Sequence, residues 1–204
     1  MSKIKTVSEL SEYIESRKSE WIRSDTTGYF SQKFINVDFT GGHFDGVSFE
    51  KSTFFSCVLN SGSFIGSDFS ACSFMRCTAI DGNFTGAIFL GAKIEYCKMQ
   101  KSLFSDCDFS DVDFAKTDMQ HAKMKNAKLK NVRLKELELF GADISECDLR
   151  ETDLEKVSFI GTKFSLAKIT SAQKSSILNI RSKSVEANMS LFIVDDSVDV
   201  LIDT

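Results

Sequence analysis

The sequence contains no proline, and no apolar run in it approaches the roughly 18 residues that a membrane-spanning helix needs. Its opening residues, MSKIKTVSELSEY, include no apolar stretch of signal-peptide length. With a net charge of −4, the chain also lacks the basic footprint of a nucleic-acid-binding protein. We therefore expect a soluble, cytoplasmic protein that contacts neither a membrane nor nucleic acid directly.

Signatures of catalysis are scarce as well. The only two histidines, His43 and His121, fall far apart in the repeat pattern described below, which argues against a histidine-dependent nucleophile or a zinc site. Neither GxGxxG nor GxxxxGK(S/T) occurs, so no phosphate-binding loop is indicated. The sequence predicts a non-enzyme without metal or cofactor.

A strict period of five residues is the main feature that is present. From Phe34 to Ile169 a large apolar residue occupies every fifth position, 28 positions in all, and only Ala79 is small. Helices and strands have periods of 3.6 and 2, so neither produces this pattern. A short fixed period held over such a length is typical of a solenoid. At Ala79 we expect either that Ile80 turns inward or that Leu59 and Met99 close over the gap.

The position two residues before each large apolar residue holds mostly small side chains. All six cysteines fall in this column: Cys57, Cys72, Cys77, Cys97, Cys107 and Cys147. No CxxC spacing occurs, which argues against a metal or redox site. We interpret these cysteines as small buried hydrophobes in a narrow slot.

The best copies of the repeat are Gly-Ala-Asp-Ile-Ser at 141–145 and Glu-Cys-Asp-Leu-Arg at 146–150. This pattern resembles the pentapeptide-repeat family, whose consensus is A(D/N)LXX. The resemblance implies an all-β solenoid, a right-handed quadrilateral β-helix with four repeats per coil, and hence about seven coils. The unbroken register is similar to the loop-free members, in a layout like that of the gyrase-interacting, quinolone-resistance proteins of the family.

With 20 residues per coil, residues n and n+20 stack into ladders that fill the core. Coils stack at strand spacing, about 4.8 Å, and each buried Phe contributes on the order of 2–3 kcal/mol. We expect these residues to form the structural core: Phe34, Phe54, Phe74, Phe64, Phe84, Phe104, Phe109, Leu129 and Leu149.

Three segments follow from where the period begins and ends. Residues 1–31 start with the capping box Thr6-Val7-Ser8-Glu9 and predict a capping helix near 7–22 followed by a loop. We expect this helix to cover the apolar column Ile35–Phe55–Met75. The β-helix occupies 32–171. Residues 172–204 leave the register, and their strand-like apolar segments predict either a cap or a homodimer contact.

Charges on the outward positions change sign about once per coil, which would make stacked columns alternate, as in Asp108–Lys128–Asp148–Lys168. Each exposed rung would contribute about 0.2–1 kcal/mol. Acidic belts and exposed apolar residues are the candidates for partner binding: Asp106, Asp108, Asp111, Asp113, Asp118, Phe140 and Ile160.

The favoured function is a non-enzymatic scaffold that binds a protein partner through the faces of a rigid rod. The first alternative comes from the resemblance: some members of the family mimic DNA, bind DNA gyrase and confer quinolone resistance. Seven coils span about 34 Å, close to one turn of B-DNA, but DNA carries one charge per roughly 1.7 Å, against −4 for this whole chain. The second alternative is a bacterial effector or immunity protein.

Overall fold

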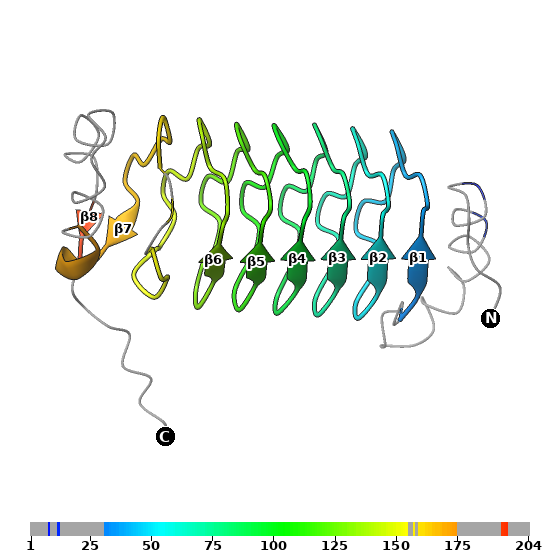
Figure 1. Cartoon of the computed structure of the whole chain (residues 1–204), viewed down its shortest axis with the longest axis horizontal. Coiled ribbons are helices and arrows are strands. Elements are labelled where there is room, and N and C mark those ends of the chain that lie inside the picture. Colours follow the sequence, from blue (N-terminus) through cyan, green and yellow to red (C-terminus); the bar gives the residue numbers. More distant parts are fainter. Residues whose placement is uncertain are drawn as a thin grey trace, which may run out of the picture.

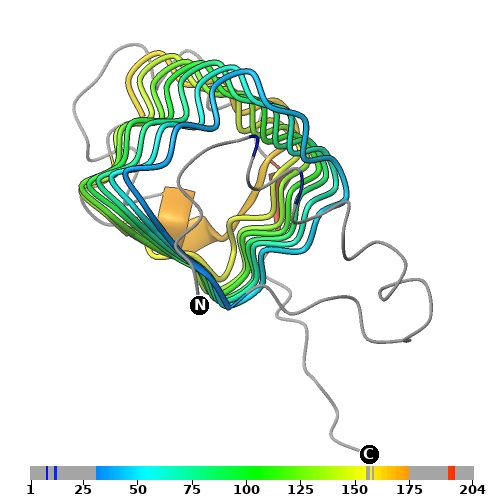
Figure 2. The same ribbon diagram turned by 90° about the vertical axis from the view of Figure 1, so that its right-hand side faces the viewer.

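The computed structural model describes residues 8, 12, 31–154, 157, 159–174 and 193–195. Over these residues the chain winds into a right-handed, four-sided β-solenoid, seen from the side in Figure 1 and along its axis in Figure 2. One side is a parallel sheet of six three-residue strands in the order of the sequence: β1 (Lys33–Ile35), β2 (Thr53–Phe55), β3 (Ser73–Met75), β4 (Lys93–Glu95), β5 (Asp113–Ala115) and β6 (Arg133–Lys135).

Each strand pairs with the residues 20 positions later, so Phe34 lies beside Phe54 and Phe54 beside Phe74. We call the side with β1–β6 side 1. Columns of single β-bridges define the others: side 2 begins with Asp38–Val58, side 3 with His43–Ser63 and side 4 with Ser48–Asp68. Coils are numbered from residue 32 in steps of 20 residues. The predicted register of n with n+20 is confirmed on all four sides.

The count of seven coils needs a small correction. Bridges continue into coil 7 on side 3, at Asp143–Lys163, and on side 4, at Asp148–Lys168. On side 1 the sheet ends at β6, and on side 2 the last described bridge is Asp118–Glu138. The described residues therefore form six coils paired on every side and a seventh paired on two sides.

The corners between sides explain the missing proline. Corner residues recur every fifth position, and nearly all have positive φ, such as Asn126 at 57° and Leu166 at 62°. Proline is locked near −65° and cannot adopt this conformation. Most other amides are donors: in repeat 86–90 the N–H groups of Gly86, Ala87, Ile88 and Phe89 all bond to backbone carbonyls. A proline would break a ladder at almost any position.

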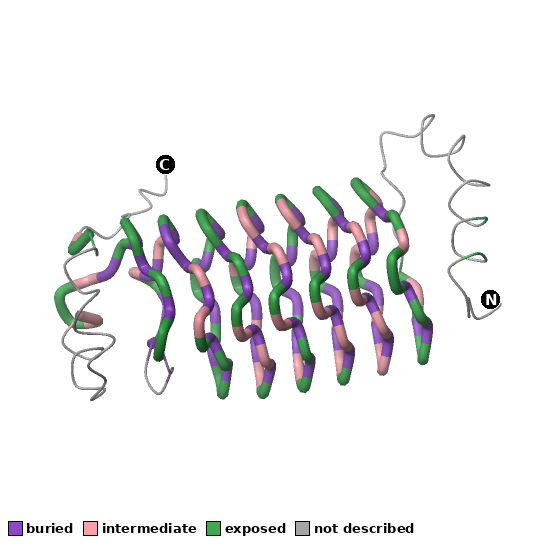
Figure 3. The backbone as a smooth tube through the Cα atoms, turned by 90° about the horizontal axis from the view of Figure 1, so that it is seen from above, coloured by how far each residue is buried: buried purple, intermediate pink, exposed green. Residues whose placement is uncertain are grey.

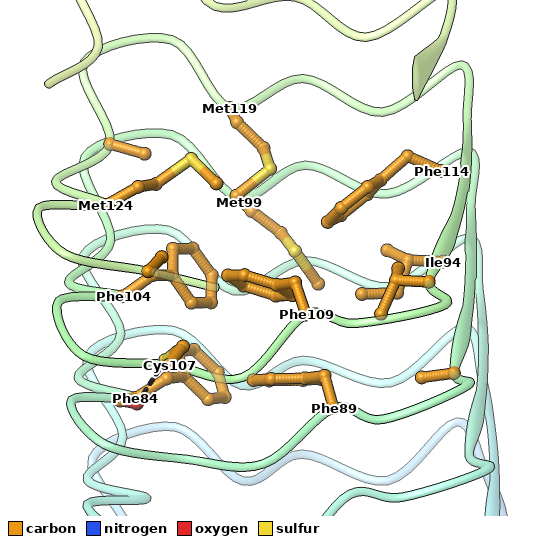
Figure 4. Packing of buried hydrophobic residues seen from close by; sticks show 14 of the residues in the cluster. Phe84, Phe89, Ile94, Met99, Phe104, Cys107, Phe109, Phe114, Met119 and Met124 are labelled. Carbon is orange, nitrogen blue, oxygen red and sulfur yellow. Dashed lines mark hydrogen bonds between the residues drawn. The ribbon is translucent and has the colours of Figure 1, made fainter. Parts of the chain in front are cut away.

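The large residue of each repeat points into the tube, where rings stack from coil to coil (Figure 4). Phe54 and Phe74 stack with centroids 4.6 Å apart, and Phe64 and Phe84 with centroids 5.0 Å apart. Neighbouring sides meet edge to face, as for Phe104 and Phe109 at 5.4 Å. The buried positions recur along every coil in Figure 3. The nine predicted core residues are between 0% and 2% exposed.

The gap at Ala79 is not filled by Ile80. Ala79 is fully buried, whereas Ile80 is half-buried and does not belong to the core cluster. The N–H of Ile80 donates to Asn60 Oδ1 at 2.9 Å, which holds this residue in its ordinary place in the turn. The expectation that Ile80 turns inward is therefore wrong, because the turn and its ladder bonds resist rearrangement.

Two further strands lie at the C-terminal end of side 4. β7 (Lys168–Ile169) pairs in parallel with β8 (Ile193–Val194), and Lys168 is opposite Ile193. Regular coils place 20 residues between partners, but here the separation is 25, one repeat more. Pairing within the chain covers the edge of β7 and favours the cap interpretation of residues 172–204 over the dimer contact.

The predicted N-terminal helix lies outside the described residues, apart from Ser8 and Glu12, which are helical. Its contact with the column Ile35–Phe55–Met75 therefore stays a prediction. In that column Ile35 is exposed, and the other two side chains are half-buried. Within the part of the chain that the structure describes, no helix is long and apolar enough to cross a membrane.

Candidate partner-binding surfaces

The five predicted aspartates form a partial ring around coils 4 and 5 and do not share one side. Asp108 lies on side 4, Asp113 on side 1 and Asp118 on side 2. Asp106 and Asp111 lie at the corners on either side of Asp108, with φ near 60°. The structure thus brings together Asp106, Asp108 and Asp111 and separates them from Asp118.

Most of these carboxylates have a partner one coil away. Asp108 Oδ2 is 3.2 Å from Lys128 Nζ, and Asp113 Oδ2 is 3.4 Å from Arg133 Nε. Two others accept from amides: Asn126 Nδ2 donates to Asp106 at 2.8 Å, and Gln100 Nε2 donates to Asp118 at 2.6 Å. Partial neutralisation of this kind makes the ring less negative than its carboxylates alone suggest.

The alternating column on side 4 stacks in the predicted order. Bridges join Asp108 to Lys128, Lys128 to Asp148, and Asp148 to Lys168. Lys128 pairs with Asp108, while Asp148 binds Arg150 of its own coil at 2.6 Å. The hydrogen bond from Arg150 lowers the pKa of Asp148 against the opposing effect of burial. Partial burial also opposes ionisation of Asp108, but hydrogen bonds from Ser110 and Lys128 hold its pKa below the usual value.

A shallow hollow of about 310 Å³ opens on side 4 of coils 5 and 6. Its walls include three lysines and three carboxylates: Lys128, Lys130, Lys168, Glu146, Asp148 and Glu151. The lysines are matched by the acids, as in Lys130–Glu151 at 3.7 Å. This balance of charge favours neither an anionic nor a cationic ligand.

The two predicted apolar candidates lie one above the other at the corner between sides 2 and 3. Phe140 is 49% exposed and Ile160 is 47% exposed. The ring of His121 meets Phe140 edge to face at 5.5 Å, and it covers Gly141 so closely that a Cβ there would fall 2.5 Å from Nδ1. Phe140 and Ile160 thus form an apolar corner, bordered by His121, on a rigid turn.

A second exposed apolar group was missed by the sequence analysis. Ile65, Ile88 and Leu90 are 43%, 40% and 46% exposed, and they lie around side 4 of coils 2 and 3. Ile65 and Leu90 directly follow core residues, as Phe140 does, so the same positional rule could have found them. Ile88 was hidden because it precedes its core residue, at a position that elsewhere on side 4 is polar.

The cysteines do not form a site. All six are free and buried, and burial raises the pKa of Cys72, Cys107 and Cys147 to about 12. His43 and His121 are four coils apart, about 19 Å along the axis. Among the described residues no group of three His, Cys, Asp or Glu side chains could hold a metal ion.

Comparison with protein families gives a consistent result along the coil. A model described as "pentapeptide repeat region" matches residues 67–144 and 93–164, and one described as "pentapeptide repeats (8 copies)" matches 33–70. Together these matches span 33–164, well over half of the chain. No functionally curated protein matches the sequence significantly.

Two solved structures illustrate the likeness. Full-length QnrB1, a plasmid-mediated fluoroquinolone resistance protein, is 14% identical, with 72% of this chain and 86% of that chain covered and a TM-score of 0.38. HetL, a pentapeptide repeat protein involved in heterocyst differentiation regulation in Nostoc sp. strain PCC 7120, is 15% identical, with 82% and 90% covered and a TM-score of 0.39. Identities and scores this low carry no information on function.

Proposed function

The chain belongs to the pentapeptide-repeat family, and we propose that it is a non-enzymatic scaffold that binds a protein partner through the surface of its rigid β-helix. The observation that carries this proposal is the corner formed by Phe140 and Ile160. Two large apolar side chains, each about half exposed, are stacked there in one column. Exposed apolar groups held together in this way are typical of protein interaction sites.

The backbone of this corner is fixed before any partner arrives. The amide of His121 donates to Phe140 O at 2.9 Å, and the amide of Gly141 donates to Ile160 O at 3.3 Å. Ladder bonds from both neighbouring coils therefore hold the turn, and binding costs little ordering of the chain. Complete burial of the two side chains would contribute on the order of 1–2 kcal/mol, so charged and polar contacts around them must supply the rest of the affinity.

Site-specific photo-crosslinking tests this proposal. We would place p-benzoylphenylalanine at position 140 of the full chain and irradiate it in lysate of the native organism. The matched control carries the same group at Lys123, an exposed position on side 3. We expect a discrete adduct at position 140 that is lost when Ile160 is changed to Asp. Adducts of equal yield at both positions, or none at 140, would refute this docking corner.

DNA mimicry toward DNA gyrase is the second candidate, and the aspartate ring of coils 4 and 5 favours it. Against it, four of the five aspartates lie beside a cation or an amide donor. A supercoiling assay with purified gyrase separates the two candidates. Inhibition that disappears with Asp111→Asn and Asp106→Asn would support mimicry. If the protein neither inhibits gyrase nor relieves its poisoning by a quinolone, this candidate is excluded.

A further inference from the structure

We propose that side 4 of coils 2 to 4 is a docking surface for a basic amphipathic helix of a protein partner. The surface has an apolar centre, Ile65, Ile88 and Leu90, and an acidic rim, Asp68, Asp106, Asp108 and Asp111. The inference rests on the scaffold role proposed above, but it concerns a surface distinct from the Phe140–Ile160 corner and assigns its partner a chemistry.

The apolar centre is exposed and rigid. Ile88 and Leu90 are on either side of the buried core residue Phe89, so both must face outward. The amide of Ile88 donates to Ser67 O at 2.9 Å, and the carbonyl of Leu90 accepts from Ala71 N–H at 2.8 Å. These three apolar side chains are 40–46% exposed, and the ladder keeps the backbone that carries them in place.

The corner between Ile65 and side 4 is bare. At Gly66 and Gly86, which occupy this corner in coils 2 and 3, an added Cβ would meet no atom within 4 Å. A partner can therefore reach the backbone of the corner and contact the apolar side chains on both sides of it. A bulkier residue here would hold a partner away from the apolar centre.

The rim is acidic on all the described positions that bear charge. Asp68 and Asp108 are the bridge partners of Ile88 in the coils before and after it. Asp106 and Asp111 follow Gly86 and Gly91 in the corner columns of coil 4. Side 4 carries no lysine or arginine in coils 2 to 4, and Arg76 is the one basic residue between residues 52 and 92.

Charge complementarity then defines the occupant. An apolar centre with a negative rim attracts a segment in which lysines or arginines flank apolar side chains, and it repels the phosphates of a nucleic acid. Farther along side 4, Lys128 and Lys130 begin a basic belt, which repels the same segment and sets where it ends.

The dimensions favour a helix as the bound form. Coils 2 to 4 span two coil spacings, about 10 Å, which matches the diameter of an α-helix, about 10–12 Å. A helix lying across the rod would place apolar residues spaced three or four apart over Ile88 and Leu90. Its basic residues would then reach Asp68 in coil 2 and the aspartates of coil 4.

NMR titration of the full chain with a designed probe tests the inference. The probe is a 14-residue helical peptide made of leucine on one face and lysine on the other, and two control peptides replace all lysines by glutamate or all leucines by serine. We expect amide shifts confined to residues 65–70, 86–91 and 105–111, with binding only to the leucine–lysine peptide. The affinity should fall about tenfold in the double variant Ile88→Ser, Leu90→Ser, a loss of about 1.4 kcal/mol.

Matched variants separate this inference from the proposed function. Phe140→Ser with Ile160→Ser should leave the titration unchanged, and Asp108→Asn with Asp111→Asn should weaken binding and reduce its dependence on salt. Equal binding of the glutamate peptide, shifts spread over all coils, or full affinity in the Ile88 and Leu90 variant would each overturn the inference. A failed titration beside a successful crosslink at position 140 would remove this surface alone.

Discussion

The thiol of Cys107 donates to the backbone carbonyl of Phe84, which lies 23 residues earlier and 2.9 Å away (Figure 4). The same relationship recurs along the small column: Cys72 bonds to Phe49 O at 2.9 Å and Thr162 to Leu139 O at 2.9 Å. Ser67 and Ser102 make equivalent bonds to Phe44 O and Ala79 O. The column therefore selects small side chains that fit beside the core and tie each coil to the one before it.

Replacing Cys107 tests whether size or donor matters more. Serine keeps a donor of similar volume, and the column already accommodates Ser67 and Ser102, so Cys107→Ser should cost little. Cys107→Ala removes the donor to Phe84 O and should lower the free energy of unfolding by about 1–2 kcal/mol. Urea unfolding followed by circular dichroism measures both. Equal losses in the two variants would show that the hydrogen bond contributes nothing.

Thiol ionisation should couple stability to alkaline pH. Burial raises the pKa of Cys72, Cys107 and Cys147 to about 12, whereas an unfolded chain ionises them near pH 8.5. The contribution of these thiols is fully present below about pH 8.5 and is lost as pH rises from there toward 12. Urea midpoints measured from pH 7 to 11 should therefore decline, and less so in a Cys72→Ser, Cys107→Ser, Cys147→Ser variant.

Phe104 anchors the middle of the core. It is fully buried, stacks on Phe84 at 5.1 Å and meets Phe109 at 5.4 Å. Phe104→Ala should cost about 3–5 kcal/mol because the tube cannot collapse around the lost ring, and Phe104→Asp should prevent folding. The surface change Phe140→Ala serves as control and should stay within about 1 kcal/mol. A Phe104→Asp chain that melts within a degree of the wild type would contradict the core assignment.

The charge column on side 4 predicts a register effect. Lys128 lies between Asp108 and Asp148, so Lys128→Glu would stack three carboxylates in consecutive coils. We expect it to destabilise more than Lys128→Gln, by about 0.5–1 kcal/mol. Most of the difference should vanish in 1 M NaCl, where screening acts over about 3 Å. A difference that persists in high salt would point to packing as its cause.

Arg150 should hold β8 on the end of the coil. Its Nη2 is 2.6 Å from Asp148 and its Nη1 is 2.9 Å from Asp195, and the side chain is only 12% exposed. The amides of Ile193 and Asp195 bond to Ala167 O and Ile169 O. Arg150→Gln should speed hydrogen exchange of these two amides about tenfold or more, while the control Arg133→Gln should leave them unchanged.

Some features of the site could not be read from the sequence. The five aspartates are contiguous in the chain, but each corner turns the next one to another side, so Asp108 and Asp118 face different directions. The bonds from the small column reach 23 residues back, a separation that follows from one coil plus the offset within a repeat. The pairing of β8 skips one repeat, and no periodicity announces such a step.

The sequence by itself determined the solenoid, its 20-residue register and its filled core, because one large apolar residue in five can be buried in only one way. Tertiary structure decided which side each outward residue faces, which partner each carboxylate takes and which apolar residues gather at the surface. Those choices depend on the corner conformation and on atoms one coil away, and a linear pattern of residue types contains neither.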